Sequence, residues 1–489
     1  MRKPFSKQRR LDCPAIPDVR LNLKCRDEIV PVLYGLQHIY SQPQLRDEIL
    51  DLVARDVNEN SRSDRGRKGL DYWHIVVLAA IRLGCNLDYD KLQNLAEEHR
   101  AMRQTMGIGG WQEQIDFSWR RICDNICLLK PETFEKISHC IVAEGIRLEP
   151  NAVKKQRADS FVVETNIHHP TESSLIFDGV RKVIELCLKL YEIYDIDGWR
   201  QHAHLLKKVK RTARDIARIS ARKGGNYQQR LAKQYGLLLE QAETIFMRAQ
   251  RTCATLQNDY KLDFVTVARI AEIEVFIERT QQVCGTARRR VLEGENKVPN
   301  ADKLFSIFEP HTQLYRRGKA GQPNQYGRLV LIYEDAAGFI SHHYIMPRHV
   351  QDRDVAVEQT RTLQKRLKNC IEEISFDRGF HSPENQEELA KIVAHVCLPK
   401  PGPKQSAEQA QTASVKFHQT KQRHPGIESA IGALQSGNGL LRCRDASEVG
   451  FERYVALAVL GRNIHALGKL LIKRADRMAP AAASMRAVA

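Results

Sequence analysis

The sequence has neither a long uninterrupted apolar segment nor a secretory signal. Its longest apolar run lies near residues 75–81, far short of the roughly 20 residues that a membrane-spanning helix needs. The basic N-terminus, MRKPFSKQRR, is not followed by the apolar region of a signal peptide. We therefore expect a soluble, cytoplasmic protein that does not work in a membrane.

The sequence also lacks recurring cysteine pairs. Its 12 cysteines are spread from Cys13 to Cys443, and only Cys123 and Cys127 lie close together. There is no repeated CxxC motif and no second Cys or His pair at zinc-finger spacing. This pattern predicts reduced, buried thiols in a reducing compartment and argues against a structural zinc site.

Acidic residues are fewer than basic ones. The chain has 76 Lys and Arg against 59 Asp and Glu, which gives a net charge of +17 and a pI of about 9.3. Such a balance favours a polyanionic partner, nucleic acid first and an anionic membrane second. The alternative is a basic soluble protein with no such partner.

One segment concentrates this charge. Residues 200–223 hold nine Lys and Arg and a single acid, Asp215. Four of the basic residues follow one another at three- and four-residue steps, so they share one face of a helix. We predict that this stripe contacts the DNA backbone, with a solvated helix face as the alternative. Its members are Arg211, Arg214, Arg218 and Arg222. Trp199, just before the segment, is expected in the core rather than stacked on bases.

Hydrophobic periodicity divides the chain into helical and strand-containing parts. Helices are expected over 72–84, 88–107, 130–146, 355–369, 382–392, 426–434 and 451–473, and strands over 158–167, 371–376 and 393–399. A hairpin with a turn at Gly338 is expected over 326–347, and a loop over 401–422. The expected domains are a helical N-terminal DNA-binding domain (1–150), a core (151–180 and 300–440), a helical insertion (181–299), a C-terminal helix packed on the core (441–475) and a disordered tail (476–489).

Three carboxylates suggest chemistry at the core. Asp159 begins the apolar part of the first strand, Asp377 follows the 371–376 strand, and Glu428 lies on the 426–434 helix. Carboxylates at strand ends can converge on one rim of a mixed sheet, and hard oxygen ligands suit Mg²⁺ or Mn²⁺. Two such ions about 3.5–4 Å apart can support an in-line phosphoryl displacement.

Other carboxylates compete for these positions. Glu164 and Asp178 are alternatives for the first, and Glu448 is the alternative for the third. Asp335 is assigned to the hairpin turn.

Four segments occur in order along the chain: ADSFVVETNIHHPTESSLIFDGVR, SFDRGFHSPEN, RHPGIESAIGAL and GFERYVALAVLGRNIHALG. Together, over about residues 30–472, they resemble bacterial insertion-sequence transposases of the DDE type, closest to the not-classified-yet (ISNCY) group. The resemblance implies an α/β catalytic core of the RNase-H-like (retroviral-integrase) fold, interrupted by a large helical insertion. It also implies that Asp159, Asp377 and Glu428 bind two Mg²⁺ ions, for which Mn²⁺ can substitute.

The function implied by this resemblance is DNA transposition. Such an enzyme cleaves DNA at the ends of a mobile element and joins them to target DNA, as a homodimer or larger assembly, in the bacterial cytoplasm and on the nucleoid when DNA-bound. Two alternatives stay open: an RNase-H-like nuclease without joining activity, and a non-catalytic DNA-binding protein derived from a transposase.

The sequence departs from one signature of these relatives, Tyr-x2-Arg-x3-Glu-x6-Lys. Arg423 stands five residues before Glu428, and Gln435 occupies the Lys position. Hairpin formation during excision is therefore not predicted, although Arg423 remains a candidate for a DNA phosphate contact. The other candidates are Arg378, for a phosphate or a salt bridge, and the polar corner residues Asn166 and His168, for DNA or local hydrogen bonds.

Overall fold

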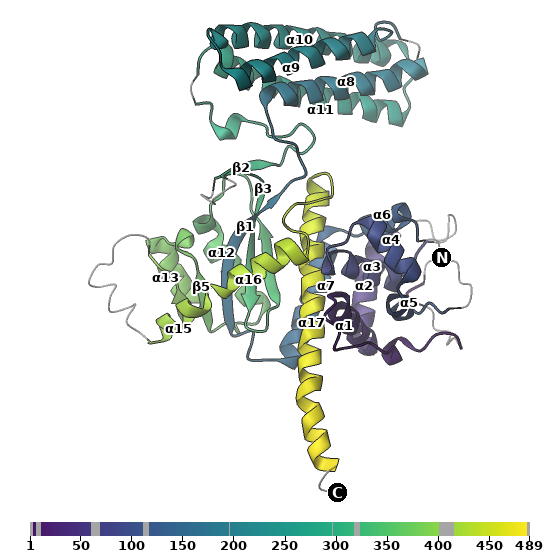
Figure 1. The fold of residues 1–489 in the computed structure, drawn as a ribbon, viewed down its shortest axis with the longest axis vertical. Coiled ribbons are helices and arrows are strands. Elements are labelled where there is room, and N and C mark those ends of the chain that lie inside the picture. Colours follow the sequence, from purple (N-terminus) through teal and green to yellow (C-terminus); the bar gives the residue numbers. More distant parts are fainter. Residues whose placement is uncertain are drawn as a thin grey trace. The chain divides into compact units, whose positions relative to one another are not determined.

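A computed structural model describes residues 3–5, 11–59, 69–110, 117–194, 196–295, 297–316, 323–400 and 415–486. Over these residues the chain is mixed α/β and forms two compact units (Figure 1). The first, here called the sheet unit, consists of Met1–Asn166 and Arg328–Ala489. The second, the helical unit, is Ile167–Gly327 and is wider than the insertion expected at 181–299.

The N-terminal part of the sheet unit is helical, as expected. Its helices share one hydrophobic core with strands and with the C-terminal helix, so 1–150 is not a separate domain. The helix expected over 88–107 is broken at His99, whose extended backbone lets its Nδ1 accept a hydrogen bond from the Met102 amide at 3.1 Å. The elements are η1 (Ile16–Asp18), α1 (Ile29–Ser41), α2 (Pro43–Glu59), α3 (Tyr72–Gly84), α4 (Tyr89–Glu98), α5 (Arg100–Thr105), α6 (Trp119–Cys127) and α7 (Pro131–Leu148).

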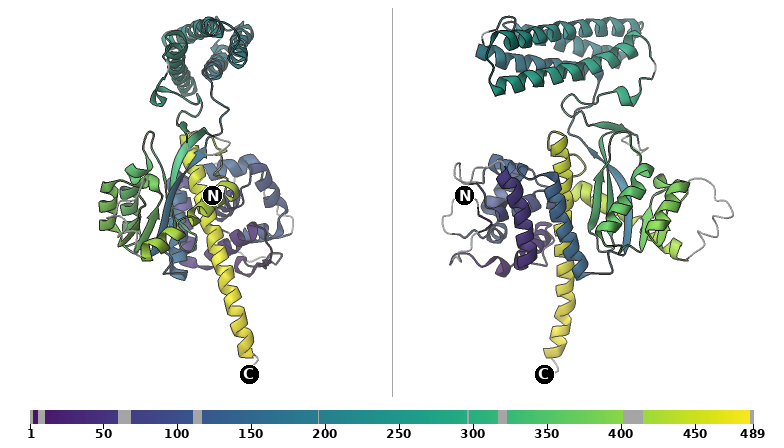
Figure 2. Two further views of the ribbon diagram at one scale, coloured as in Figure 1. Left: turned by 60° about the vertical axis from the view of Figure 1, so that its left-hand side comes forward. Right: turned by 180° about the vertical axis from the view of Figure 1, so that it is seen from behind.

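Helix α17 (Glu448–Arg486) is the central element of the sheet unit. It packs against α1, α3 and α7 (Figure 2). Close packing requires glycine, because a Cβ at Gly461 would lie 2.5 Å from the Gly84 nitrogen. By length and composition its residues 448–477 could cross a membrane, but 72% of the apolar window is buried inside the protein, as in a core helix.

The helix also continues where a disordered tail was expected. Alanine, the best helix former, dominates the end of this segment, and α17 extends through 476–486. Residues 487–489 lie outside the described part of the chain.

The strands form one mixed sheet of six within the described residues. The order is β2-β3-β1-β5-β6, with β4 also paired to β3. Pairs β1–β5 and β5–β6 are parallel, whereas β3–β4 is the antiparallel hairpin expected from the sequence, turning at Gly338 with a φ of +88°. The strands are β1 (Lys155–Glu164), β2 (Gln313–Tyr315), β3 (Gln325–Asp335), β4 (Ile340–Ile345), β5 (Glu373–Phe376) and β6 (His395–Cys397).

Helices cover both faces of the sheet (Figure 1). On one face, the Tyr333 hydroxyl lies 3.1 Å from Thr360 Oγ1 of α12. On the other, Phe161 and Val163 of β1 join the core that includes α17. The remaining elements of this unit are α12 (Asp352–Arg366), η4 (Arg378–Phe380), α13 (Pro383–Ile392), α15 (Val415–Arg423), α16 (Gly426–Gly432) and η5 (Ala433–Gly437).

One loop prediction needs correction. Residues 415–422, expected in a loop, begin helix α15, whereas 401–414 lie outside the described residues. Because Thr420 and Arg423 both bond Glu373 of β5, tertiary contacts order this polar segment.

The helical unit has its own hydrophobic core. Trp199 is fully buried there and donates from Nε1 to Thr252 Oγ1 at 2.9 Å, which confirms the core assignment. Gly179 marks a close helix crossing, because a Cβ there would lie 1.9 Å from Thr280 Oγ1. The elements are α8 (Glu172–Tyr194), α9 (His202–Arg222), α10 (Tyr227–Asp259), α11 (Phe264–Ala287), η2 (Arg288–Leu292) and η3 (Asn300–Asp302).

Candidate active site and nucleic-acid interface

Asp159 and Asp377 are neighbours across two parallel strands. Ala158 of β1 pairs with Phe376 of β5, and the two aspartates are the next residues on each chain segment. Adjacent strands lie about 4.8 Å apart, so the two backbones present their carboxylates at the same level of the sheet. Asp377 follows its strand as predicted. Strand β1 begins and ends three residues earlier than the expected 158–167, so Asp159 is its fifth residue.

Both aspartates point to the face that carries α16. Side chains alternate along a strand, so Asp159 shares its face with Arg157 and Phe161. Arg157 donates from Nη1 to the Arg423 carbonyl at 3.2 Å, just before α16. On β5, the Ser375 side chain lies on the face of Asp377, since Asp377 keeps an extended backbone.

Glu428 lies in the first turn of α16, and this helix packs on β1. His424 links the helix to the sheet, since its Nδ1 lies 3.1 Å from Ser375 Oγ. Burial lowers the pKa of His424, and the nearby negative charges of Asp377 and Glu428 oppose that shift. Both carboxylates therefore lie within electrostatic reach of the same imidazole.

An ion pair lies beside Asp159 on the same face of the sheet, with its carboxylate buried and its guanidinium half-buried. Arg157 Nη2 lies 2.6 Å from Glu334 Oε2, and Glu334 is 3% exposed. Burial raises the pKa of Glu334, and Arg157 opposes this by favouring the carboxylate. Gly426 lies close to this pair, because a Cβ at this position would lie 1.9 Å from Arg157 Nη1 and would displace the guanidinium. Arg157 thus fixes the start of α16 relative to β1.

The three carboxylates do not form a closed metal site. No group of three or more His, Cys, Asp or Glu among the described residues is arranged to hold a metal ion. Asp377 and Glu428 are exposed, whereas Asp159 is half-buried. The arrangement is a pair of aspartates on rigid strands, with a glutamate on the helix above the same face.

Each competing carboxylate has a structural partner. Glu164 pairs with Arg442 at 3.1 Å, and Glu448 pairs with Arg328 at 2.8 Å. Asp335 Oδ1 accepts hydrogen bonds from two amides of the β3–β4 turn, as predicted, and burial raises its pKa to about 7.

The predicted basic stripe lies on one face of helix α9, in the helical unit. All four of its arginines are exposed on α9, and its other side buries Val209 and Ile216. Arg218 Nη1 lies 3.2 Å from Asp215 Oδ1, an exposed pair that solvent screens. The stripe, formed by Arg211, Arg214, Arg218 and Arg222, is therefore available to an anionic partner.

Of the remaining DNA-binding candidates, two are exposed and two are bonded to carboxylates of the protein. Arg378 and Asn166 are exposed, whereas Arg423 forms an ion pair with the buried Glu373. His168 Nε2 lies 2.6 Å from Asp178 Oδ2. Burial, the largest single effect, lowers the pKa of His168, but the hydrogen bond and charge of Asp178 together with the His169 carbonyl outweigh it, so the pKa is raised and the imidazolium is favoured.

Sequence reasoning missed Arg157 and His424. Nothing local marked Arg157, since its role depends on Glu334, which is distant in sequence. His424 could have been found from its position one helical turn before Glu428.

All twelve cysteines are free thiols, as expected, but the prediction that they are buried holds for only five of them, since Cys25 and Cys370 are exposed and the other five are half-buried. Comparison of the chain with protein-family models, curated proteins and solved structures found no match.

Proposed function

We propose that this chain is a DNA transposase of the DDE type, which cleaves and joins DNA by phosphoryl transfer at the ends of a mobile element. The observation that carries the proposal is the pairing of Asp159 and Asp377 at one level of adjacent parallel strands. Rigid strands hold the two carboxylates at a fixed separation. Catalysis by proximity and orientation requires reacting groups to be held in this way. Glu428, on the helix over the same face, supplies the third carboxylate.

The chain order supports an RNase-H-like core with an insertion. Such a core predicts one sheet whose first strand is separated by helices from its other strands. Strand β1 is followed by the helices α8 to α11, and the chain then returns to the same sheet at β2 and β3. The second aspartate directly follows β5, which lies beside β1.

The donor chemistry of the site fits Mg²⁺ or Mn²⁺, because carboxylate oxygens are the ligands these ions prefer. Asp159 and Asp377 would hold the metal, with Glu428 as the further ligand. Two bound ions supply activation of a water or 3′-hydroxyl and stabilisation of the leaving oxygen. The protein's own contribution is to orient the aspartates and to keep Arg157 paired with Glu334 on the same face.

The direct test is Asp377→Asn in the full chain. A plasmid that carries the gene with its native flanking DNA serves as substrate, with Mg²⁺ present. We expect cleavage and joining to fall to background while DNA affinity stays within about threefold, since the exposed basic stripe is unchanged. Asp51→Asn, an exposed residue of α2, is the matched control and should retain activity. Retained joining by Asp377→Asn would overturn the proposal.

A metal-binding measurement gives an independent readout. Titration of the wild-type chain with Mn²⁺ should show binding that Asp159→Asn weakens at least tenfold and Asp51→Asn does not. If neither aspartate variant changes Mn²⁺ binding, the metal assignment fails even where some nuclease activity is seen.

A second candidate is a non-catalytic DNA-binding protein. It is favoured by one observation, that the described residues contain no preassembled group of three metal ligands. DNA binding without Mn²⁺ binding or cleavage would establish it. Cleavage without strand transfer would instead indicate a nuclease, and sedimentation of the chain with and without duplex DNA tests the proposed dimer or larger assembly.

A further inference from the structure

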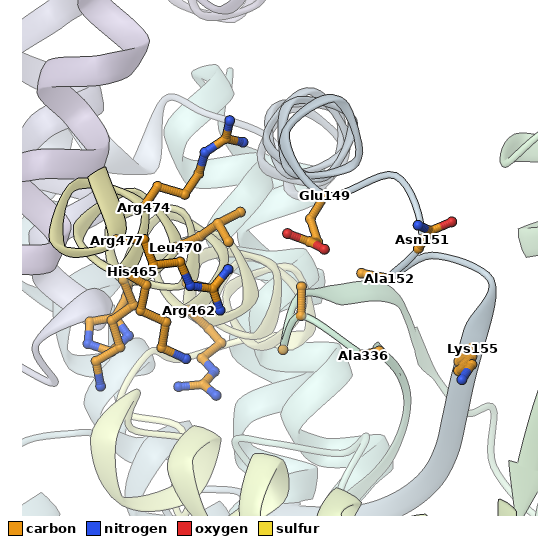
Figure 3. Close-up of a pocket in the computed structure, with 15 residues that line it drawn as sticks. Glu149, Asn151, Ala152, Lys155, Ala336, Arg462, His465, Leu470, Arg474 and Arg477 are labelled. Carbon is orange, nitrogen blue, oxygen red and sulfur yellow. The ribbon is translucent and has the colours of Figure 1, made fainter. Parts of the chain in front are cut away.

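A cavity of about 520 Å³ lies beside α17 in the sheet unit (Figure 3). Its walls come from α17, from the end of α7 with the following turn, from the start of β1 and from the β3–β4 turn. In Figure 3, Arg462, Arg474 and Arg477 project from α17, while Glu149 and Lys155 come from the other walls. None of the wall residues belongs to the aspartate pair described above.

The cavity is strongly basic. Glu149 is its single carboxylate, and His465 is not a cation near neutral pH, because burial first and the Lys469 charge second lower its pKa to about 4. The basic side chains that line it are Lys155, Arg462, Lys469, Lys473, Arg474 and Arg477. The nearby Glu28, 3.9 Å from Lys469, offsets part of this charge, and the net positive potential that remains would attract a polyanion.

Few of these cations have an internal partner. Arg474 donates to the Leu148 carbonyl at 2.8 Å, and Lys469 lies 3.9 Å from Glu28 Oε2. Within the described residues, Lys155, Lys473 and Arg477 form no ion pair. The Nε of Arg462 is buried without a hydrogen-bond partner in the same part of the chain.

The spacing of the cations fits a polymer better than a small anion. Arg462, Lys469, Lys473 and Arg477 follow one another at seven- and four-residue steps, so they share one face of α17. At 1.5 Å per residue they extend over about 22 Å. This length corresponds to roughly six base pairs of duplex DNA at 3.4 Å each.

The walls offer no means of reading bases. No aromatic side chain lines the cavity, so base stacking, the usual recognition mode for single strands, has no platform. Leu470 is the one large apolar wall residue, which is too little to insert into a membrane. Contacts to phosphates alone are independent of sequence.

We propose that this basic cavity is a second nucleic-acid site, which holds the phosphate backbone of duplex DNA without reading its sequence. The inference rests on the proposed function and adds a backbone contact outside the aspartate pair. Lys155 begins β1, and Asp159 lies four residues along the strand, about 13 Å away. The DNA held in the cavity therefore flanks the reacting phosphate and keeps the duplex on the sheet unit.

The test measures DNA affinity with Asp377→Asn as background, so that no substrate is consumed. In that background, Lys469→Gln, Lys473→Gln and Arg477→Gln are combined. A fluorescein-labelled duplex of random sequence is titrated by anisotropy at several salt concentrations. We expect affinity to fall roughly 10- to 100-fold. Each lost phosphate contact reduces the magnitude of the slope of log K against log salt concentration by about 0.9, so three lost contacts should reduce it by about 2 to 3. The control removes three exposed cations elsewhere through Lys136→Gln, Lys261→Gln and Lys365→Gln, and should change affinity less than threefold.

Equal weakening by the two triple variants, or an unchanged salt slope in the cavity variant, would overturn the proposal. Loss of binding to phosphatidylserine vesicles with unchanged DNA binding would assign the cavity to membranes instead. The double variant Lys473→Gln with Arg477→Gln changes only exposed side chains. It should therefore keep the wild-type circular dichroism spectrum and show a reduced slope. Because affinity and cleavage are measured separately, a failed cavity test leaves the catalytic proposal standing, and the converse also holds.

Discussion

Replacing Asn463 by leucine should destabilise the sheet unit by about 3–5 kcal/mol. Asn463 is fully buried on α17. Its Oδ1 accepts from the Ile340 amide at 2.8 Å, and its Nδ2 donates to the Ile340 carbonyl at 2.9 Å. Nδ2 also donates to Ser138 Oγ of α7 at 2.8 Å. One amide thus joins α17 to β4 and α7.

The magnitude follows from the groups that leucine would leave unpaired. Ile340 begins β4 where the β3–β4 register shifts, and Asn463 bonds both of its backbone polar groups. A buried polar group without a partner costs about 1–3 kcal/mol. Leucine would leave two backbone groups and the Ser138 hydroxyl without this partner. If the surrounding structure relaxes enough to satisfy part of them, the total is about 3–5 kcal/mol.

Urea denaturation followed by tryptophan fluorescence measures this loss. The chain has two compact units, so unfolding need not be two-state, and only the sheet-unit transition should move. Ser138→Ala removes a single partner and should cost about 1 kcal/mol. Asn258→Leu, exposed on α10, should change stability by at most about 0.5 kcal/mol. A loss below about 1 kcal/mol for Asn463→Leu would refute the reasoning.

Two further predictions concern packing and pH. Gly461→Ala should cost about 1–3 kcal/mol, because the added methyl would lie 2.5 Å from the Gly84 nitrogen. Gly236→Ala, with open space around it within α10, should instead stabilise the helical unit by about 1 kcal/mol; the same sign for both variants would contradict the packing argument. Burial lowers the pKa of His342 from 6.5 to about 4, so the unfolded chain binds more protons between these values. The contribution of the neutral imidazole to the free energy of unfolding is complete above pH 6.5 and is lost as pH falls towards 4. At pH 5 the loss is about 2 kcal/mol. His342→Gln should flatten the pH profile of sheet-unit stability, and an unchanged profile would exclude this cause.

Local signals in the sequence determined many of the elements. Ser382 caps α13 by accepting from the Asn385 amide at 3.0 Å, and Pro383 occupies the first helical position, as predicted. The β3–β4 hairpin turns at Gly338, and Asp335 bonds the turn amides. These features depend on residues within a few positions of one another, so a sequence window contains the whole interaction.

The breaks and extensions of elements were less predictable. His99 interrupts a helix because its own side chain caps the next one. Helix α15 forms in a polar segment because Thr420 and Arg423 bond Glu373, which precedes them by more than forty residues. Propensity is a weak prior that such tertiary contacts override.

For the candidate site, the sequence by itself determined the side chains that the proposal uses: carboxylates at positions 159, 377 and 428, and a helix face of arginines on α9. Only the tertiary structure decided their arrangement. The parallel register of β1 and β5 brings Asp159 level with Asp377, and α16 lies over the same face through Arg157, His424 and Gly426. It also decided that the N-terminal helices share a core with the sheet, and that cations of α17 meet Lys155 around one cavity. Side-chain type and short spacing are properties of the chain, whereas register and helix placement depend on contacts between residues far apart in sequence.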